Sequence, residues 1–359
     1  MDWEALILNI FNNRGIPILY ETGYNKEKVM KHITIADIAR EAGVSKATVS
    51  RVLSRPYLVN TVTREKIESL VQKYSYTPNS LARGLAGMPT RNIGVVVDEF
   101  PNNFYIDMAD GIDRIFSANN YFFQIMSSGW IAERELQGIR SMVKNKVDGI
   151  LIAPAAPDSE TVEYLKKSGV PFILMNCQND DPDISYVYCD NYRGGALMAD
   201  HFNTLSQDQI IIISVADHQS VRDRIKGFTD HLSTRAERIV RYTDAKTYKD
   251  GYDLTPLMVE QNSIKTKKTS LFVTNDYVAI GVITRLLEMG ISIPGQAAVA
   301  GFDNIRISSL CRIPLTTISQ SVIEMGSASA AALLDLINKK ATEPFKYTIE
   351  PRLVVRESA

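Results

Sequence analysis

Residues 34–53 constrain the fold of this chain more than any other stretch, and they read Thr-Ile-Ala-Asp-Ile-Ala-Arg-Glu-Ala-Gly-Val-Ser-Lys-Ala-Thr-Val-Ser-Arg-Val-Leu. Thr34 and Asp37 have the spacing of a capping-box-like pair at the start of a helix. Gly43 suits the left-handed residue that ends such a helix, and Ser45 is placed to cap a second one. The stretch therefore predicts two short helices joined by a tight glycine turn.

Apolar and polar residues fall on different faces of these two predicted helices. The inward set is Ile35, Ile38, Ala39, Val49, Val52 and Leu53, and the outward set is Lys46, Ala47, Ser50 and Arg51. This is the pattern of a helix-turn-helix whose second helix enters a DNA major groove. An ordinary helical hairpin is the alternative. Because caps, turn glycine and small polar outward residues coincide, we favour DNA binding.

A third predicted helix and a local excess of positive charge follow. Asn60 is a candidate N-cap for a helix to about Tyr74, with Ile67, Leu70 and Val71 on its apolar face. Residues 31–90 hold nine Lys or Arg and four Asp or Glu, a charge of +5, while the whole chain carries −1. This asymmetry is typical of a DNA-binding head on a body with another role, although a solvated basic face has the same composition.

Together with the run Tyr76-Thr-Pro-Asn-Ser-Leu-Ala-Arg-Gly-Leu85, residues 34–53 resemble the head and hinge of lactose-repressor (LacI/GalR-type) transcription regulators. The resemblance continues through Asp148-Gly-Ile-Leu-Ile, Asp190-Asn191, Arg224-Ile-Lys-Gly-Phe, Thr274-Asn-Asp, Gly301-Phe-Asp-Asn, Pro314-Leu-Thr-Thr-Ile and Glu350-Pro-Arg-Leu-Val-Val-Arg-Glu-Ser. It covers about residue 31 to the C-terminus. The resemblance implies a two-lobed body like that of periplasmic binding proteins, with three chain crossings between the lobes. The segment 316–320 and the tail would return between them.

From residue 92 onward, continuously apolar strands alternate with amphipathic helices. The first series predicts strands at 92–97, 121–126, 149–153 and 171–175, with helices at 104–119, 131–145 and 158–168. The second predicts strands at 209–214, 239–242, 271–273 and 298–300, with helices at 220–233, 247–261 and 276–289. Such strands are typical of parallel sheets covered on both faces. The fold class is therefore α/β, with a small all-α head and two doubly wound lobes.

These patterns divide the chain into an extension at 1–30, a helix-turn-helix head at 31–76, a hinge with a short helix at 77–90, and a body at 91–359. In the body we expect a first lobe of about 91–204 and 320–341 and a second of about 205–319 and 342–359. The extension lacks the basic start of a secretory signal. It is either an artefact of an upstream start before Met30, which we favour slightly, or an extra helix from about Trp3 to Phe11.

Composition and missing motifs exclude several classes of protein. Three widely spaced cysteines argue against a disulfide scaffold and suit a reducing cytoplasm. Four histidines without a paired Cys-x-x-Cys argue against structural zinc, and no apolar run is long enough to span a membrane. The chain has no P-loop, nucleophile elbow, metalloprotease helix or dinucleotide fingerprint. We therefore expect no catalytic residue, no metal, no cofactor and no enzyme activity.

The family resemblance also implies an effector site, carried over residue by residue. Its expected members are Phe104, Tyr105, Arg224, Asn275, Asp276 and Asp303, with Asp190 and Gln320 as weaker candidates. An aromatic face, carboxylates and an arginine fork suit a sugar or another polar ligand. Lys246 stands where the family often has an aromatic residue, so an inward Lys246 would indicate a ligand with a carboxylate or phosphate. Each residue also has an ordinary structural alternative. These are packing under a helix for Phe104 or Tyr105, a surface position for Arg224 and Lys246, an N-cap for Asp276 and a plain turn for Asp303.

Position in the helix-turn-helix assigns the expected DNA contacts. Lys46, Ala47 and Arg51 would face base edges, with Arg51 suited to guanine. Thr34, Thr48, Ser50, Asn79 and Arg83 would contact phosphates or set the register. We expect residues 79–86 to form a hinge helix that is too short to be stable alone and orders when two copies meet on DNA. By analogy with the family, Leu85 would enter the minor groove, although ordinary packing between domains is the alternative.

These observations predict a cytoplasmic, ligand-responsive transcription regulator, by family default a repressor of a carbohydrate-uptake or catabolic operon. Its partners would be double-stranded operator DNA, a small effector and a second copy of the chain. One head contacts little DNA, so a homodimer on a pseudo-palindrome is expected. A two-lobed small-molecule receptor without operator binding is the alternative. Salt-dependent duplex binding separates the two.

Overall fold

The computed structural model describes residues 33–76, 88–98, 103–156, 158–215, 218–233, 239–341 and 343–359. The chain forms two compact units, Met1–Asn79 and Ser80–Ala359, which are taken in turn below. The extension at 1–30 and the expected hinge helix at 79–86 lie outside the described residues. Asn79, Arg83 and Leu85 lie outside them with the hinge.

The first unit contains the three predicted helices of the head. Its elements are α2 (Ile35–Ala42), α3 (Lys46–Ser54), the 3-10 turn η1 (Pro56–Leu58) and α4 (Thr61–Lys73). Each helix contributes a fully buried residue to a single core: Ile38 of α2, Val49 of α3 and Ile67 of α4. Glu41 of α2 joins the C-terminal end of α4, because its carboxylate accepts from Lys73 Nζ at 2.8 Å.

The predicted caps of the head are present. The Asp37 carboxylate accepts from the backbone N–H and the hydroxyl of Thr34, at 3.0 and 2.7 Å. Gly43 has a φ of 70°, the left-handed conformation that glycine adopts without steric cost. Ser45 Oγ accepts from the backbone N–H of Thr48 at 3.1 Å. These local bonds explain why α2 and α3 begin and end where the sequence predicts.

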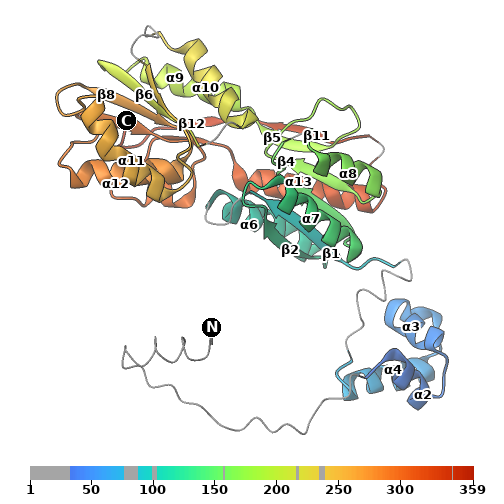
Figure 1. The fold of residues 1–359 in the computed structure, drawn as a ribbon. Helices are drawn as coiled ribbons and strands as arrows, with labels where there is room; N and C mark the ends of the chain where they lie inside the picture. Colours follow the sequence, from blue (N-terminus) through green and yellow to red (C-terminus); the bar gives the residue numbers. More distant parts are fainter. Residues whose placement is uncertain are drawn as a thin grey trace, which may run out of the picture. The chain divides into compact units, whose positions relative to one another are not determined.

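In the second unit, the first lobe is a six-stranded sheet with helices on both faces (Figure 1). Its strands are β1 (Asn92–Val97), β2 (Phe122–Ser127), β3 (Gly149–Ile152), β4 (Phe172–Met175), β5 (Tyr186–Cys189) and β11 (Lys346–Ile349), in the order β11-β5-β4-β3-β1-β2 and parallel throughout. Its helices are α6 (Asn103–Ala118), α7 (Ala132–Lys144), α8 (Glu160–Ser168) and α13 (Val322–Ile337). Val95 packs in the core with α6 and α13, and Val96 packs in the core with α7 and α8. This double burial explains the continuously apolar strands.

The second lobe repeats the arrangement with four parallel strands. These are β6 (Gln209–Ile213), β7 (Ile239–Tyr242), β8 (Thr269–Val273) and β9 (Ala297–Ala300), in the order β7-β6-β8-β9. The helices are α9 (Asn191–Phe202), α10 (Gln219–His231), α11 (Tyr248–Gln261) and α12 (Asp276–Glu288), followed by the turn η3 (Arg306–Ser309). Ile212 packs with Phe202 and Phe228 of α9 and α10, and Ile213 packs in the core that holds α11 and α12. Both predicted series of strands and helices are confirmed.

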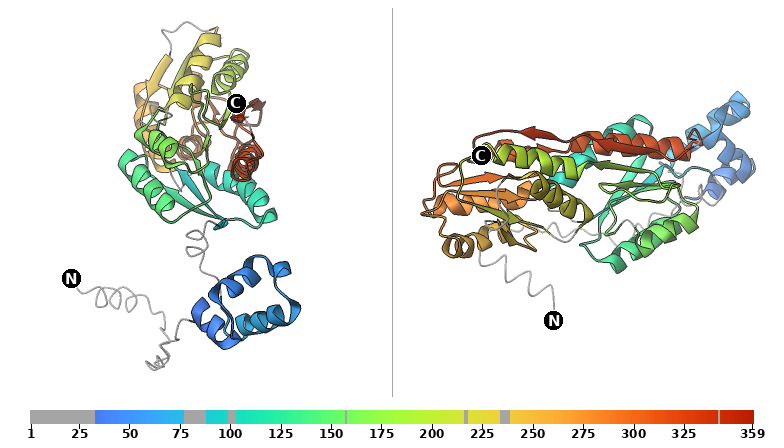
Figure 2. Two further views of the ribbon diagram at one scale, coloured as in Figure 1. Left: turned by 90° about the vertical axis from the view of Figure 1, so that its right-hand side faces the viewer. Right: turned by 90° about the horizontal axis from the view of Figure 1, so that it is seen from above.

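The chain passes between the lobes three times, as the resemblance implied. It crosses after β5, after β10 (Thr317–Ser319), and between β11 and β12 (Arg352–Val354). β10 and β12 pair antiparallel beside the second lobe, and Figure 2 shows the red C-terminal segment running from one lobe to the other.

The structure corrects the expected lobe boundaries at two elements. α9, expected in the first lobe, packs on α10, and its Met198 and Phe202 lie in the core of the second lobe. β11, expected in the second lobe, pairs with β5 of the first. Apolar periodicity shows that a segment is a buried strand or helix but does not show which sheet it joins.

We expect Gly227→Ala to destabilise the second lobe. A Cβ on Gly227 of α10 would lie 1.9 Å from the backbone oxygen of Tyr192 in α9, so the two helices would have to separate. Overpacking of this kind costs about 1–3 kcal/mol, whereas helix propensity alone favours alanine by up to about 1 kcal/mol. Urea denaturation measures the change. Gly138→Ala is the matched control, since its Cβ meets only the flexible Met126 side chain. Equal effects of the two variants would contradict the close crossing.

Candidate functional site

Helix α3 presents a polar face to solvent in the head. Lys46, Ala47 and Arg51 are exposed, while Thr48 and Ser50 are half-buried. The Thr48 hydroxyl lies 2.9 Å from Ser45 Oγ, so it belongs to the N-cap as well as to the outer face. The helix-turn-helix geometry that the sequence predicts is therefore present.

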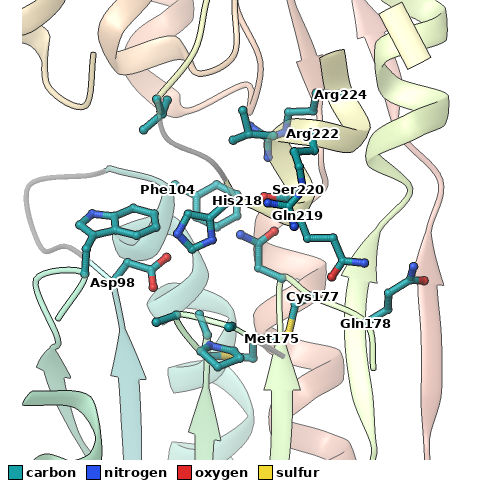
Figure 3. Close-up of a pocket in the computed structure, with 18 of the residues that line it drawn as sticks. Asp98, Phe104, Met175, Cys177, Gln178, His218, Gln219, Ser220, Arg222 and Arg224 are labelled. Atoms are coloured by element: carbon teal, nitrogen blue, oxygen red, sulfur yellow. The ribbon is translucent and has the colours of Figure 1, made fainter. Parts of the chain in front are cut away.

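A cavity of about 650 Å³ lies between the lobes of the body (Figure 3). The first lobe lines it with Asp98, Phe104, Tyr105, Trp130, residues 153–156, Asp158 and residues 175–180. The second lobe lines it with Val215, residues 218–222, Arg224, Asn275 and Asp303. Most of these residues follow the carboxyl ends of parallel strands, the edge at which open α/β sheets bind ligands. Five expected effector residues are among them: Phe104, Tyr105, Arg224, Asn275 and Asp303.

Arg224 of α10 is the central polar residue on the second-lobe side. Its side chain is buried, and its Nε donates to Asn191 Oδ1 at 2.8 Å. Its Nη1 donates to the backbone oxygen of Thr274 at 2.6 Å and lies 3.3 Å from Asp303 Oδ1. Its guanidinium carbon lies 4.0 Å from the centre of the Phe302 ring. Four segments of the second lobe therefore meet at one cation.

Asp303 is a buried carboxyl with few donors. Gln320 Nε2 donates to its Oδ1 at 2.6 Å, and the longer contact to Arg224 reaches the same oxygen. Burial raises the pKa of Asp303 to about 7, even though the neighbouring Arg224 acts in the opposite direction. Its φ of 124° is rare for a residue with a side chain.

On the first-lobe side, Tyr105 donates from its hydroxyl to Asp98 Oδ2 at 2.5 Å. Burial and the adjacent Asp98 carboxylate hold the pKa of Tyr105 well above its usual value, so the phenol stays protonated. Phe104 meets the Tyr105 ring edge-on, with the ring centres 5.1 Å apart. This wall therefore combines an aromatic surface with a fixed hydrogen-bond pair.

Comparisons with known proteins match both parts of the chain. Residues 34–79 match the model for bacterial regulatory proteins of the lacI family, and residues 199–359 match the model for a periplasmic binding protein-like domain. Catabolite control protein A of Priestia megaterium is 30% identical over 334 residues, which are 91% of this chain and 99% of the relative. The chain belongs to the LacI family of transcription regulators.

Other relatives agree with this membership. A transcriptional repressor PurR of Vibrio atlanticus is 28% identical over 330 residues, 90% of this chain and 98% of that protein. The structure of a LacI-family regulator of Enterococcus faecium with bound ribose has a TM-score of 0.67 at 27% identity and covers 75% of this chain and 98% of that one. The LacI-family chain thus has a DNA-binding domain and a ligand-binding domain and is a regulator, not an enzyme.

Four expected effector residues of this LacI-family regulator do not line the cavity. Asp190 caps α9 by accepting from the backbone N–H of Arg193 at 2.9 Å. Gln320 lies behind Asp303 and holds its carboxyl. Lys246 is half-buried before α11, and its side chain is not part of the cavity wall. We therefore do not carry Asp190, Gln320 or Lys246 forward as ligand contacts, nor the negatively charged ligand that an inward Lys246 would indicate.

Asp276, the fourth of these residues, is fully buried behind the wall. Its carboxylate accepts from the hydroxyls of Ser308 and Thr317 at 2.5 and 2.6 Å and from the backbone N–H of Ile305 at 3.1 Å. Burial raises the pKa of Asp276 against these three donors. The carboxylate therefore joins the start of α12 to η3 and β10 and has a structural role.

The sequence analysis missed several residues that line the cavity. Trp130 follows β2, Asn176 follows β4, and His218 and Gln219 begin α10. Their positions in the sequence could have identified these residues, since each follows a strand of a predicted parallel sheet or precedes the helix after that strand. No group of three or more metal-ligating side chains occurs among the residues that the structure describes. Within the same residues, no helix is long and apolar enough to cross a membrane.

We expect Asp303 to make stability depend on pH. Because its pKa is raised to about 7, the folded state keeps the proton while the unfolded chain loses it near the ordinary value of 3.8. This group therefore lowers stability as pH rises from about 4 to 7, and Asp303→Asn removes that contribution. Urea denaturation at pH 5 and 7.5 should show the wild type losing stability relative to the variant. A difference that stays constant with pH would contradict the raised pKa.

Proposed function

We propose that this LacI-family regulator is a repressor of genes for the uptake or breakdown of a carbohydrate, controlled by a sugar in the cavity between its lobes. The observation that carries the proposal is the presence of two sites in one chain. The head has an exposed polar face on α3, and the body has a polar cavity with aromatic side chains between its lobes. Such a protein acts in the cytoplasm, where its operator is.

The charges of the cavity favour an uncharged ligand. Asp98, Asp158 and Asp180 line it together with Asp303, whose raised pKa leaves it only partly charged near neutral pH, against the cations Arg222 and Arg224. An additional phosphate or carboxylate would therefore meet more negative than positive charge. Amides and aromatic rings on the same wall suit hydroxyl groups and the apolar faces of a sugar ring. The ribose bound to the Enterococcus faecium relative is of this class.

Operator contacts follow from the exposed face of α3. Lys46, Ala47 and Arg51 would reach base edges in the major groove, and Thr34, Thr48 and Ser50 would contact phosphates or set the register. In the hinge, Asn79 and Arg83 would contact phosphates or set the register, and Leu85 would enter the minor groove. The PurR relative is named a repressor, which supports repression rather than activation.

A homodimer on a pseudo-palindromic operator completes the proposal. Ile106 of α6 is 58% exposed and Leu310 at the end of η3 is 80% exposed, which are large apolar surfaces for a monomer. Their elements adjoin, because Arg306 of η3 pairs with Asp107 and Asp110 of α6 at 2.9 and 2.8 Å. A second copy seated here would contact both lobes. Its binding would therefore depend on the lobe arrangement that the ligand selects.

The decisive experiment combines ligand discovery with operator binding. Thermal unfolding of the full chain against neutral sugars, sugar acids, sugar phosphates and nucleobases should show stabilisation by a neutral sugar, about 2.7 kcal/mol at a hundred times its Kd. A duplex selected from random sequence should bind with a steep salt dependence and change in affinity at least tenfold with that sugar. Absence of salt-dependent duplex binding would favour a receptor without an operator. Stabilisation by sugar phosphates alone would overturn the ligand class.

We expect Arg51→Ala to weaken binding to the selected duplex by about 1–3 kcal/mol and to relax its sequence preference at one base pair. The physical reason is the loss of a two-pronged contact to a guanine edge. Fluorescence anisotropy with the duplex and with single-base variants measures both effects. Lys66→Ala on α4 removes the same charge as a control. An equal loss in the two variants would show that Arg51 contributes only charge.

A further inference from the structure

Trp130 occupies a turn that is fixed to the end of β1. Gly129 N–H donates to the backbone oxygen of Asp98 at 2.8 Å, and Ser128 N–H donates to that of Val97 at 2.9 Å. Gly129 and Trp130 have φ values of 63° and 64° in succession. A tryptophan in the left-handed region is unfavourable, so the surrounding bonds must hold it there. The turn aims one large side chain into the cavity at a conformational cost.

The Trp130 ring contacts the opposite lobe. Its centre lies 4.3 Å from the centre of the His218 imidazole, at an angle of 67° between the ring planes. Trp130 follows β2 in the first lobe, and His218 caps α10 in the second. This aromatic contact therefore joins the two lobes across the cavity.

The indole N–H of Trp130 is buried and has no acceptor among the described residues. Asn176 Oδ1 and Gln219 Oε1 belong to residues that line the cavity, and these two acceptors are likewise buried without a hydrogen bond. Burial without a hydrogen bond is unfavourable, and a ligand relieves it when these side chains turn toward the cavity and the ligand supplies the missing partners. A ligand that matches these three atoms offers one hydrogen-bond acceptor beside two hydrogen-bond donors, as adjacent hydroxyl groups on a ring do.

We propose that Trp130 selects the ligand and holds the lobes around it. Its N–H donates to an oxygen of the bound sugar while its ring remains against His218. The inference rests on the proposed function, because it assumes that the cavity holds a small molecule. Occupancy then strengthens the contact between the lobes, since the ring is fixed from both sides. A ligand lacking an acceptor at this point leaves the N–H unpaired and binds more weakly.

The test uses the full chain with Trp3→Phe, which leaves Trp130 as its single tryptophan. Ultraviolet resonance Raman spectroscopy, which reports hydrogen bonding of the indole N–H, should show it unbonded in the free protein. Acrylamide quenching of Trp130 should increase at least twofold with His218→Ala. A bonded N–H without ligand, or quenching unchanged by His218→Ala, overturns the proposal without reference to any sugar.

Neutral sugars including D-ribose and cellobiose are then titrated. The parent should bind at least one of them, and Trp130→Phe, which keeps a ring but lacks the N–H, should bind it at least tenfold more weakly at unchanged melting temperature. Tyr164→Phe, a deletion of a hydroxyl elsewhere in the same lobe, should bind normally. Equal affinity of parent and Trp130→Phe overturns the proposal. If no sugar binds the parent, the sugar-controlled function fails, while an unbonded N–H and the His218→Ala effect support Trp130 as a contact for another ligand that carries an acceptor.

Discussion

The buried guanidinium of Arg224 is the interaction on which the ligand-binding lobe depends. A charge removed from water is tolerated only where hydrogen bonds and counter-charges replace its hydration. Arg224 obtains these from α9, from the end of β8 and from Asp303, and it stacks on Phe302. Arg224 and Asp303 themselves line the cavity. The need to satisfy one cation therefore fixes the strand ends that a ligand would meet.

Two contacts of different kinds join the lobes. Arg306 pairs with Asp107 and Asp110 from an exposed position, and exposed ion pairs contribute about 0–1 kcal/mol each. The Trp130–His218 contact lies on the cavity wall, where aromatic pairs contribute about 0.5–1.5 kcal/mol beyond their buried area. Neither is strong enough to lock the lobes. Their sum is comparable with the few kcal/mol that a ligand must supply to shift a two-state equilibrium.

Much of this fold could be predicted from residues 34–53 and from the apolar strands, because caps and periodicity are local properties. The lobe membership of β11 and α9 could not. For β11 it depends on which distant strand a four-residue segment pairs with, and for α9 it depends on packing against α10. Five effector positions matched the cavity, whereas Asp276 did not. A carboxylate at a strand end looks the same in sequence whether it faces a ligand or accepts from Ser308 and Thr317. The hydrogen-bond partners distinguish the two roles, and Ser308 and Thr317 lie 32 and 41 residues further along the chain.

The cavity wall contains features that do not stabilise the empty protein. Trp130, Asn176 and Asp303 all have positive φ, Trp130 and Asn176 each bury an unpaired polar atom, and burial raises the pKa of Asp303. Local rules are broken in folded proteins chiefly where function requires it. Under the proposed function, a ligand that supplies the missing hydrogen bonds would stabilise the folded state at the same point, so binding and closure of the lobes would be linked through Trp130 and Asn176.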